Sequence, residues 1–335
     1  MNLTTTYLGL TLSNPLVASA GPLSRTVDGV RHLADAGVGA IVLPSLFEEQ
    51  VQREAERDAR LAETGAESFA ESLSYLPGTV DGEAGPRRYL DLLSRAAAVA
   101  GVPVIASLNG VTAGGWTDYA AAMQDAGAAA IELNVYYLPP DPRMPGRDVE
   151  QRYVDVLTTV TAAVSIPVAV KLAPFFSSAG EVAIRLDRAG ADGLVLFNRF
   201  MQADIDPETL TVSTGLKLSS PAEAALPRSW IARLRGLMAG SLAASTGVET
   251  AGDVAAYLLA GADVVMTTSS LLRHGPSHAA VLIDELTEWL KRKGFSGVDD
   301  MRGLLAVPAG AHGSAFERAG YLTAIEEATR TYGPH

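Results

Sequence analysis

Four near-copies of one short phrase recur along the 335 residues, and they constrain the fold more than any other feature. Each copy reads as the end of a helix, a glycine and a short apolar run, at residues 36–43, 126–133, 189–196 and 260–267. Glycine suits the left-handed position that follows a helix. The apolar runs alternate too little for half-exposed strands and are too short for helices, so they predict strands buried on both faces. Repeated helix–glycine–strand units indicate an α/β protein.

The whole chain is predicted to alternate between strands and helices. Strands are expected at residues 16–19, 40–43, 104–107, 130–134, 168–172, 193–197, 242–245 and 264–267, and helices at residues 27–36, 87–100, 116–126, 149–164, 179–189, 228–239, 250–260 and 276–293. Eight strands, each followed by a helix, predict a single (β/α)8 TIM barrel. No linker interrupts the pattern, so residues 1–335 are expected to form one domain.

Two additions and one alternative complete the fold prediction. A hairpin within residues 1–15 is expected to cover the bottom of the barrel, and a C-terminal helix at residues 313–333 is expected to pack outside it. An open doubly wound sheet is the alternative, but it usually carries a glycine-rich dinucleotide fingerprint after its first strand. Residues 18–22 read Ala-Ser-Ala-Gly-Pro and lack that fingerprint.

Composition limits the partners. The net charge of −12 argues against non-specific binding to nucleic acid or membrane surfaces. The absence of cysteine excludes disulfides, thiolate metal sites and a cysteine nucleophile. His274 and His278 have the spacing of a helical metal pair, but Gly275 and Pro276 interrupt the helix, so no metal site is expected. With neither a signal-like start nor an apolar run long enough for a membrane span, the chain is predicted to be cytoplasmic.

The active site of a barrel lies at the carboxyl ends of its strands, next to the loops that follow them. Three of these loops, residues 44–86, 135–148 and 198–227, are long enough to indicate function. The last two strands lead into Ser245-Thr246-Gly247-Val248 and Thr267-Thr268-Ser269-Ser270. Glycine and small hydroxyl residues at these two places predict a phosphate site, although ordinary helix capping is the alternative.

Lys171 ends the apolar strand Val-Ala-Val-Lys-Leu, which is unusual because burying an unpaired charge is costly. Three interpretations remain open: a lysine reaching the barrel rim, a Schiff-base amine, or a fixed cation beside an electron-rich cofactor ring. Asn134 and Asn198 on neighbouring strands favour recognition of a ring and a substrate. Glu132 is expected on the same inward face as Asn134.

The motifs taken together resemble the soluble dihydroorotate dehydrogenases over nearly the whole chain. They are Asn14-Pro15-Leu16, Ala18-Ser19-Ala20-Gly21, Glu132-Leu133-Asn134, Val170-Lys171-Leu172 with Pro174, Asn198, Gly247-Val248-Glu249-Thr250, the run 257–262, Gly275-Pro276, Lys293-Gly294-Phe295 and Arg302-Gly303. This resemblance implies a barrel that binds FMN and acts on dihydroorotate, orotate or a related small planar acid. It also implies fumarate or another small electron acceptor, and a homodimer.

The resemblance assigns roles to several residues. Lys171 would be catalytic, near flavin N1, where it would stabilise the negative charge of the reduced ring. The residues implied to bind the cofactor are Ala20, Gly21, Ser45, Asn109, Asn134, Lys171, Thr246, Gly247, Thr268 and Ser269. The residues implied to bind the substrate are Ser72, Asn134, Asn198 and Arg199.

Several positions depart from the family pattern. Tyr137 stands where the family has its cysteine or serine base, and Pro139, Ser72, Pro44 and Arg199 replace an asparagine, an asparagine, a lysine and a serine. These departures indicate a dihydroorotate dehydrogenase-like branch whose substrate is open.

Two of these departures, Tyr137 and Arg199, have more than one possible role. Tyr137 is the candidate proton donor, because a tyrosine of ordinary pKa is a good acid and a poor base near neutral pH. It would act as a base only if Arg143 or Arg199 lowered its pKa, and the alternative is that it is a lid over the flavin. Arg199 is expected either to bind a substrate carboxylate or to pair with Asp204 or Asp206.

Two other functions remain open at this stage. The first is an FMN-binding barrel without dihydroorotate activity, acting as an electron-transfer or regulatory subunit. The second is a phosphate-binding barrel without flavin, such as an aldolase that uses Lys171.

Overall fold

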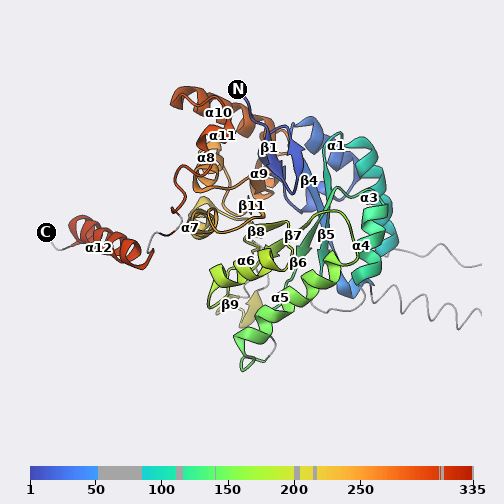
Figure 1. The fold of residues 1–335 in the computed structure, drawn as a ribbon, viewed down its shortest axis with the longest axis horizontal. Coiled ribbons are helices and arrows are strands. Elements are labelled where there is room, and N and C mark those ends of the chain that lie inside the picture. The colour runs from blue at the N-terminus through green and yellow to red at the C-terminus, as the bar shows by residue number, and fades with distance from the viewer. Residues whose placement is uncertain are drawn as a thin grey trace, which may run out of the picture.

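A computed structural model describes residues 1–51, 85–110, 116–139, 141–199, 204–213, 217–308, 310 and 313–333. Its centre is a closed barrel of parallel strands in the order β11-β12-β3-β4-β5-β6-β7-β8 (Figure 1). The strands are β3 (Leu16–Ala18), β4 (Ala40–Phe47), β5 (Val104–Asn109), β6 (Ala130–Asn134), β7 (Val168–Leu172), β8 (Gly193–Leu196), β11 (Ser241–Ala244) and β12 (Val264–Thr267). The predicted TIM barrel is therefore confirmed, and the open sheet is wrong.

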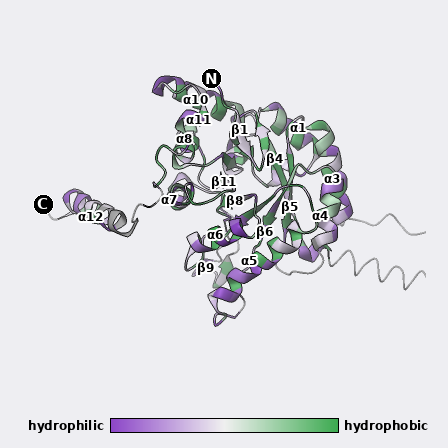
Figure 2. Cartoon of the chain, in the orientation of Figure 1, coloured by the Kyte–Doolittle hydropathy of each residue, from purple (hydrophilic) through white to green (hydrophobic). Residues whose placement is uncertain are grey.

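Helices surround the barrel. They are α1 (Val27–Asp35), α3 (Pro86–Val99), α4 (Trp116–Asp125), α5 (Gly146–Thr161), α6 (Ala179–Arg188), α7 (Ala225–Leu234), α8 (Ala251–Ala260), α9 (Ser269–His274), α10 (His278–Lys293) and α11 (Val298–Met301). Figure 2 shows hydrophobic strands inside and hydrophilic stretches on the helices around them. Every residue of β5, β6, β7 and β8 is buried, as expected for strands that face the helices on one side and the barrel interior on the other.

The glycines of the four repeated phrases end their helices in the predicted way. Gly37, Gly127, Gly190 and Gly261 have φ values of 88°, 96°, 100° and 117°. This left-handed region favours glycine because a side chain there is strained. The repeated phrase therefore marks the points where the chain turns from an outer helix into the next barrel strand.

The N-terminal hairpin is present and closes one end of the barrel. Its strands β1 (Thr5–Tyr7) and β2 (Leu10–Leu12) pair antiparallel. Tyr7, Leu8 and Leu12 are buried with inward-facing strand residues such as Val17, in a cluster separate from the core under the helices. The Leu8 N–H donates to the Ser241 hydroxyl at 3.0 Å, at the start of β11. The hairpin thus fills the amino-terminal end of the barrel, opposite the strand ends that should carry the site.

The structure also differs from the expected elements in three places. Strand β4 continues to Phe47 past a register shift between Val42 and Ser45. The loop after β8 carries a small antiparallel pair, β9 (Asp204–Asp206) and β10 (Thr211–Ser213). The C-terminal helix α12 (Gly313–Tyr332) forms, but residues 318 and 320–332 are all exposed and the helix lies apart from the barrel in Figure 1. Its expected packing against the barrel is therefore wrong, and the single domain over residues 1–335 stays a prediction.

Within the described part of the chain, none of the helices has the length and apolar character needed to cross a membrane.

A side chain at Gly39 would disturb the packing of the first repeat. A Cβ atom at Gly39 would lie 2.3 Å from the backbone oxygen of Asn14, while the Gly39 N–H donates to the Leu16 oxygen at 2.7 Å. Because backbone atoms must move to admit the methyl group, we expect Gly39→Ala to destabilise the fold by about 1–3 kcal/mol. Thermal unfolding measures the change. Gly146→Ala is the control, since a Cβ there meets nothing within 4 Å, and an equal loss in both variants would contradict the prediction.

Candidate functional site

A cavity of about 120 Å³ opens among the loops at the carboxyl ends of the strands. Its lining brings together most of the residues that the sequence singled out: Ala20, Lys171, Asn198, Arg199, Thr246, Gly247, Thr268 and Ser269. They come from the ends of β3, β7, β8, β11 and β12. The barrel therefore gathers at one end residues separated by up to 249 positions, as between Ala20 and Ser269.

Lys171 is held at this end by a buried ion pair. Its Nζ lies 3.2 Å from Glu132 Oε1 and donates to Ser19 Oγ at 3.4 Å. The Lys171 and Glu132 side chains are 8% and 1% exposed. Glu132 Oε2 is buried and has no hydrogen-bond partner within the described part of the chain. Lys171 thus forms a buried ion pair at the wall of the cavity, and its stem does not extend into solvent. Its role as a cation beside a cofactor ring stays a prediction.

The two asparagines also meet. Asn198 Nδ2 donates to Asn134 Oδ1 at 2.9 Å, and Asn134 lies beside Lys171 in the register of β6 and β7. Asn109 lies beside Asn134 in the register of β5 and β6, and it is 6% exposed. Three amide side chains and one ammonium therefore stand at neighbouring strand ends, which gives a set of directed hydrogen-bonding groups for a planar ligand.

The loops after β11 and β12 form a close-fitting turn. Gly247 has φ 70°, and a Cβ atom there would lie 2.8 Å from the Ser220 oxygen and 3.0 Å from the Ala224 nitrogen. Thr246 also has a positive φ of 84°, and the Tyr257 hydroxyl donates to its carbonyl at 2.6 Å. Gly21 packs against the Thr268 side chain, where a Cβ atom would lie 2.5 Å from Thr268 Cγ2. Gly247 therefore permits a close backbone approach that a side chain would block, and a turn of this kind suits anion binding by N–H groups.

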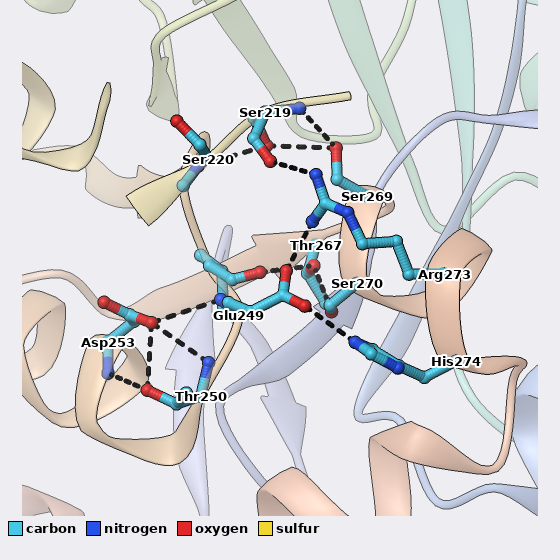
Figure 3. A network of polar contacts seen from close by, with 12 residues as sticks. Ser219, Ser220, Glu249, Thr250, Asp253, Thr267, Ser269, Ser270, Arg273 and His274 are labelled. Carbon is cyan, nitrogen blue, oxygen red and sulfur yellow. Dashed lines mark hydrogen bonds and ion pairs between the residues drawn. The ribbon is translucent and has the colours of Figure 1, made fainter. Parts of the chain in front are cut away.

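A polar network that the sequence did not reveal surrounds these loops (Figure 3). Ser219 Oγ donates to Ser269 Oγ at 3.0 Å, and the Gly247 N–H donates to Ser219 Oγ at 3.3 Å. Arg273 binds both Glu249 and the Ser219 carbonyl, and His274 Nε2 lies 2.7 Å from Glu249 Oε1. The only signal in the sequence was position: Glu249 follows the Gly247 turn, and Arg273 follows the Ser269 turn.

Charge and hydrogen bonds fix the protonation of the acidic residues in this network. Burial alone would raise the pKa of Glu249, but the hydrogen bond from His274 and the charge of Arg273 outweigh it and lower that pKa below its usual value. Burial likewise opposes a lowered pKa at Asp253, where hydrogen bonds from Thr250 and Arg228 prevail. Both groups are carboxylates near neutral pH.

Arg199 is paired differently from the expectation. Its Nε donates to Glu223 Oε1 at 2.9 Å and its Nη1 donates to the Lys217 carbonyl. The expected partners Asp204 and Asp206 are therefore wrong, because β9 carries them away from the guanidinium into a strand pair while η3 (Pro221–Ala224) brings Glu223 to it. Arg199 still lines the cavity.

Tyr137 lies against α5. Its hydroxyl donates to Met144 Sδ at 3.4 Å, and the Arg152 guanidinium carbon lies 4.2 Å from the centre of its ring. Arg143 pairs with Asp141 at 2.9 Å, so the cation against Tyr137 is Arg152 and neither Arg143 nor Arg199. Tyr137 is absent from the cavity lining.

One further candidate lies away from the cavity. Ser45 Oγ is 2.8 Å from Ser107 Oγ, and Ser45 lines a separate cavity of about 650 Å³ between α1 and α3. Ser72 lies outside the described residues.

A family model described as dihydroorotate dehydrogenase matches residues 2–290 of the 335. The chain belongs to the dihydroorotate dehydrogenase family. It is 28% identical over 312 residues to the catalytic subunit of dihydroorotate dehydrogenase B (NAD(+)) of Methanocella arvoryzae, which covers 91% of this chain and 98% of the relative. It is 27% identical over 276 residues to a putative dihydroorotate dehydrogenase A (fumarate) of Aeropyrum pernix, which covers 74% of this chain and 88% of the relative.

Family membership confirms the resemblance and sets the residues in context. The lysine, the asparagines and the glycine turns of this dihydroorotate dehydrogenase family member gather at one end of the barrel, whereas Tyr137 is directed toward α5. Lys171 and the Gly247 turn therefore line one cavity. The residues that differ from the family pattern, Tyr137 and Arg199, are those expected to act on the substrate.

Proposed function

We propose that this chain is an FMN-dependent oxidoreductase of the dihydroorotate dehydrogenase type. It transfers a hydride between a CH–CH bond of a small planar acid, dihydroorotate, orotate or a relative, and N5 of the flavin. The observation that carries the proposal is the buried ammonium of Lys171 in the same cavity as the Gly247 turn. A cation and an anion-binding turn in one cavity suit a ligand with an electron-rich ring and a phosphate.

The residues present fit this cofactor. The N–H groups at Gly247, Thr268 and Ser269 would hold the phosphate, Ala20 and Gly21 would give the ring a flat contact, and Lys171 would place positive charge beside it. Bound FMN would supply the two-electron acceptor that no side chain of this chain can provide. The 120 Å³ cavity is smaller than the roughly 300–1,000 Å³ of ordinary ligand pockets. A cavity of this size would hold only part of FMN, and the remainder would lie outside it.

Lys171, Asn134 and Asn198 would perform the fixed part of the chemistry. The ammonium of Lys171 is held in place by Glu132, so it can stabilise negative charge without moving when the ring gains electrons. The two amides would orient the substrate plane. Arg199 would bind a substrate carboxylate in exchange for its contact with Glu223. Its side chain is accessible to a ligand, because 32% of it is exposed in the present pair.

Tyr137 is the proposed proton donor, and in the structure its hydroxyl contacts Met144. Removing that hydroxyl tests the role. We expect Tyr137→Phe to lower turnover by about 100-fold or more if its hydroxyl delivers the proton, because general acid catalysis is worth that much. FMN affinity, measured by flavin fluorescence, should not change. Turnover within a few-fold of the parent protein would show that Tyr137 only covers the flavin.

The relatives support a proposal for the electron acceptor. The names of the relatives point to fumarate or NAD(+), and we propose fumarate or another small molecule as the acceptor of this chain. A homodimer in the cytoplasm, without nucleic-acid or membrane partners, stays a prediction.

A second candidate function is an FMN-binding subunit that transfers electrons without oxidising dihydroorotate. The placement of Tyr137 against Met144 favours it, because the proposed proton donor does not line the cavity that contains Asn198. Anaerobic mixing of the flavin-loaded protein with dihydroorotate separates the two functions. Bleaching of the flavin absorbance supports the dehydrogenase, bound flavin that stays oxidised supports the second function, and a protein that refuses FMN contradicts both.

A further inference from the structure

Arg273 connects two loops that the barrel places side by side. Its Nη2 donates to the Ser219 carbonyl at 2.6 Å, in the loop after β8. Its Nη1 lies 2.5 Å from Glu249 Oε2, in the loop after β11. Arg273 itself belongs to α9, the helix that follows β12. A single guanidinium thus joins the segments that follow three successive strands of the barrel (Figure 3).

Glu249 anchors this guanidinium. Its other oxygen, Oε1, lies 2.7 Å from His274 Nε2, and its backbone oxygen lies 3.4 Å from His278 Nε2. The Glu249 side chain is 23% exposed and the Arg273 side chain 31%. A carboxylate shared between Arg273 and His274 holds the arginine fork in one orientation, which a freely exposed pair would not do.

The connection has one effect on the cavity. The Ser219 carbonyl that Arg273 binds belongs to a residue whose hydroxyl lies 3.0 Å from Ser269 Oγ and 3.3 Å from the Gly247 nitrogen. Ser219, Gly247 and Ser269 all line the cavity, whereas Arg273 and Glu249 do not. Arg273 therefore acts on this wall from behind it.

We propose that Arg273, braced by Glu249, is a positioning residue that sets the affinity of the site for the phosphate of its cofactor. The inference rests on the proposed function and adds to it the group that aligns the phosphate-binding turns. Its planar fork is essential, because one guanidinium must reach a carbonyl and a carboxylate at once. A lysine at the same position would keep the charge but could not make both contacts in a fixed geometry.

Binding of FMN and riboflavin to the flavin-free protein tests this proposal, with quenching of flavin fluorescence as the readout. Riboflavin lacks the phosphate and reports on the ring alone. We expect Arg273→Ala to weaken FMN binding by roughly 10- to 100-fold, the effect of losing hydrogen bonds to a charged group. Riboflavin binding should stay within about twofold, as for a substitution remote from the ring. Arg273→Lys should resemble Arg273→Ala, and Glu249→Gln should weaken FMN binding in the same direction.

Arg330→Ala is the matched control, because Arg330 forms an exposed pair with Glu326 on α12. It should bind both flavins like the parent protein. Unchanged FMN affinity in Arg273→Ala, or equal losses for FMN and riboflavin, would overturn the proposal. Parent-like FMN affinity in Arg273→Lys would overturn the role of the fork. If Arg273→Ala does not fold, Ser219→Ala and Glu249→Gln carry the same comparison. If the parent protein binds no FMN, the proposed function fails and the inference with it.

Discussion

Lys171→Met is expected to slow electron transfer between substrate and flavin by roughly 100- to 1,000-fold, the usual cost of losing one preorganised electrostatic group. Lys171 lines the cavity, and its ammonium lies 3.2 Å from Glu132 Oε1. Methionine keeps the length and apolar stem of the side chain but removes the charge. Stopped-flow measurement of flavin reduction, with the flavin-loaded protein and a reducing substrate, gives the rate.

The same substitution should also reduce stability, because it leaves Glu132 as a buried carboxylate without its partner. Breaking a buried pair in this way costs about 3–5 kcal/mol. The double variant Lys171→Met/Glu132→Gln removes both charges and should recover much of the thermal stability, since neutral replacements of a buried pair are often tolerated. It should not recover the rate. Recovery of both would mean that Lys171 serves the fold and has no part in the chemistry.

Asp263→Ala should lower stability by about 3–5 kcal/mol, because it removes a buried carboxylate that binds two arginines and a backbone N–H. The Asp263 carboxylate accepts hydrogen bonds from Arg235, from Arg302 at 2.9 Å and from the Leu242 N–H at 2.8 Å. Its side chain is 8% exposed, and the Arg302 side chain is 14% exposed. One carboxylate therefore ties the start of β11 to the residues that follow α7 and α11.

Thermal unfolding of Asp263→Ala measures this loss. Asp299→Ala is the control, because Asp299 also pairs with Arg302 but is 69% exposed. That substitution should change stability by no more than about 0.5 kcal/mol, as is usual at the surface. Similar losses in the two variants would show that burial does not govern the contribution of Asp263.

The barrel was predictable because its signal is local. Gly37, Gly127, Gly190 and Gly261 each need a left-handed backbone, and each is followed within a few residues by a fully buried run. A helix end and a buried strand can be recognised within about eight residues. The regular repetition of this unit predicts a closed barrel of strands. Strand bounds at β6, β7 and β12 match the expected ranges for the same reason.

The contacts of the site were predictable only where the barrel itself determines them. Lys171 and Asn134 end adjacent strands, so their proximity follows from the strand order. The partner of Arg199 depends on how a long loop folds: the expected acids were Asp204 and Asp206, whereas Glu223, further along the same loop, forms the pair. The contacts of Arg273 with Ser219 and Glu249 span 54 and 24 positions and carry no periodic pattern. The sequence of α12 predicts a helix, but it does not predict where that helix lies relative to the barrel.

Tyr7, Leu8 and Leu12 close the amino-terminal end of the barrel, and in the described part of the chain the cavity with Lys171 lies at the opposite end. An electron donor and an electron acceptor would then have to occupy the same entrance in turn. Such an arrangement leads to double-displacement kinetics, in which reciprocal plots of the rate give parallel lines. At high concentration the electron donor and the electron acceptor would each inhibit binding of the other.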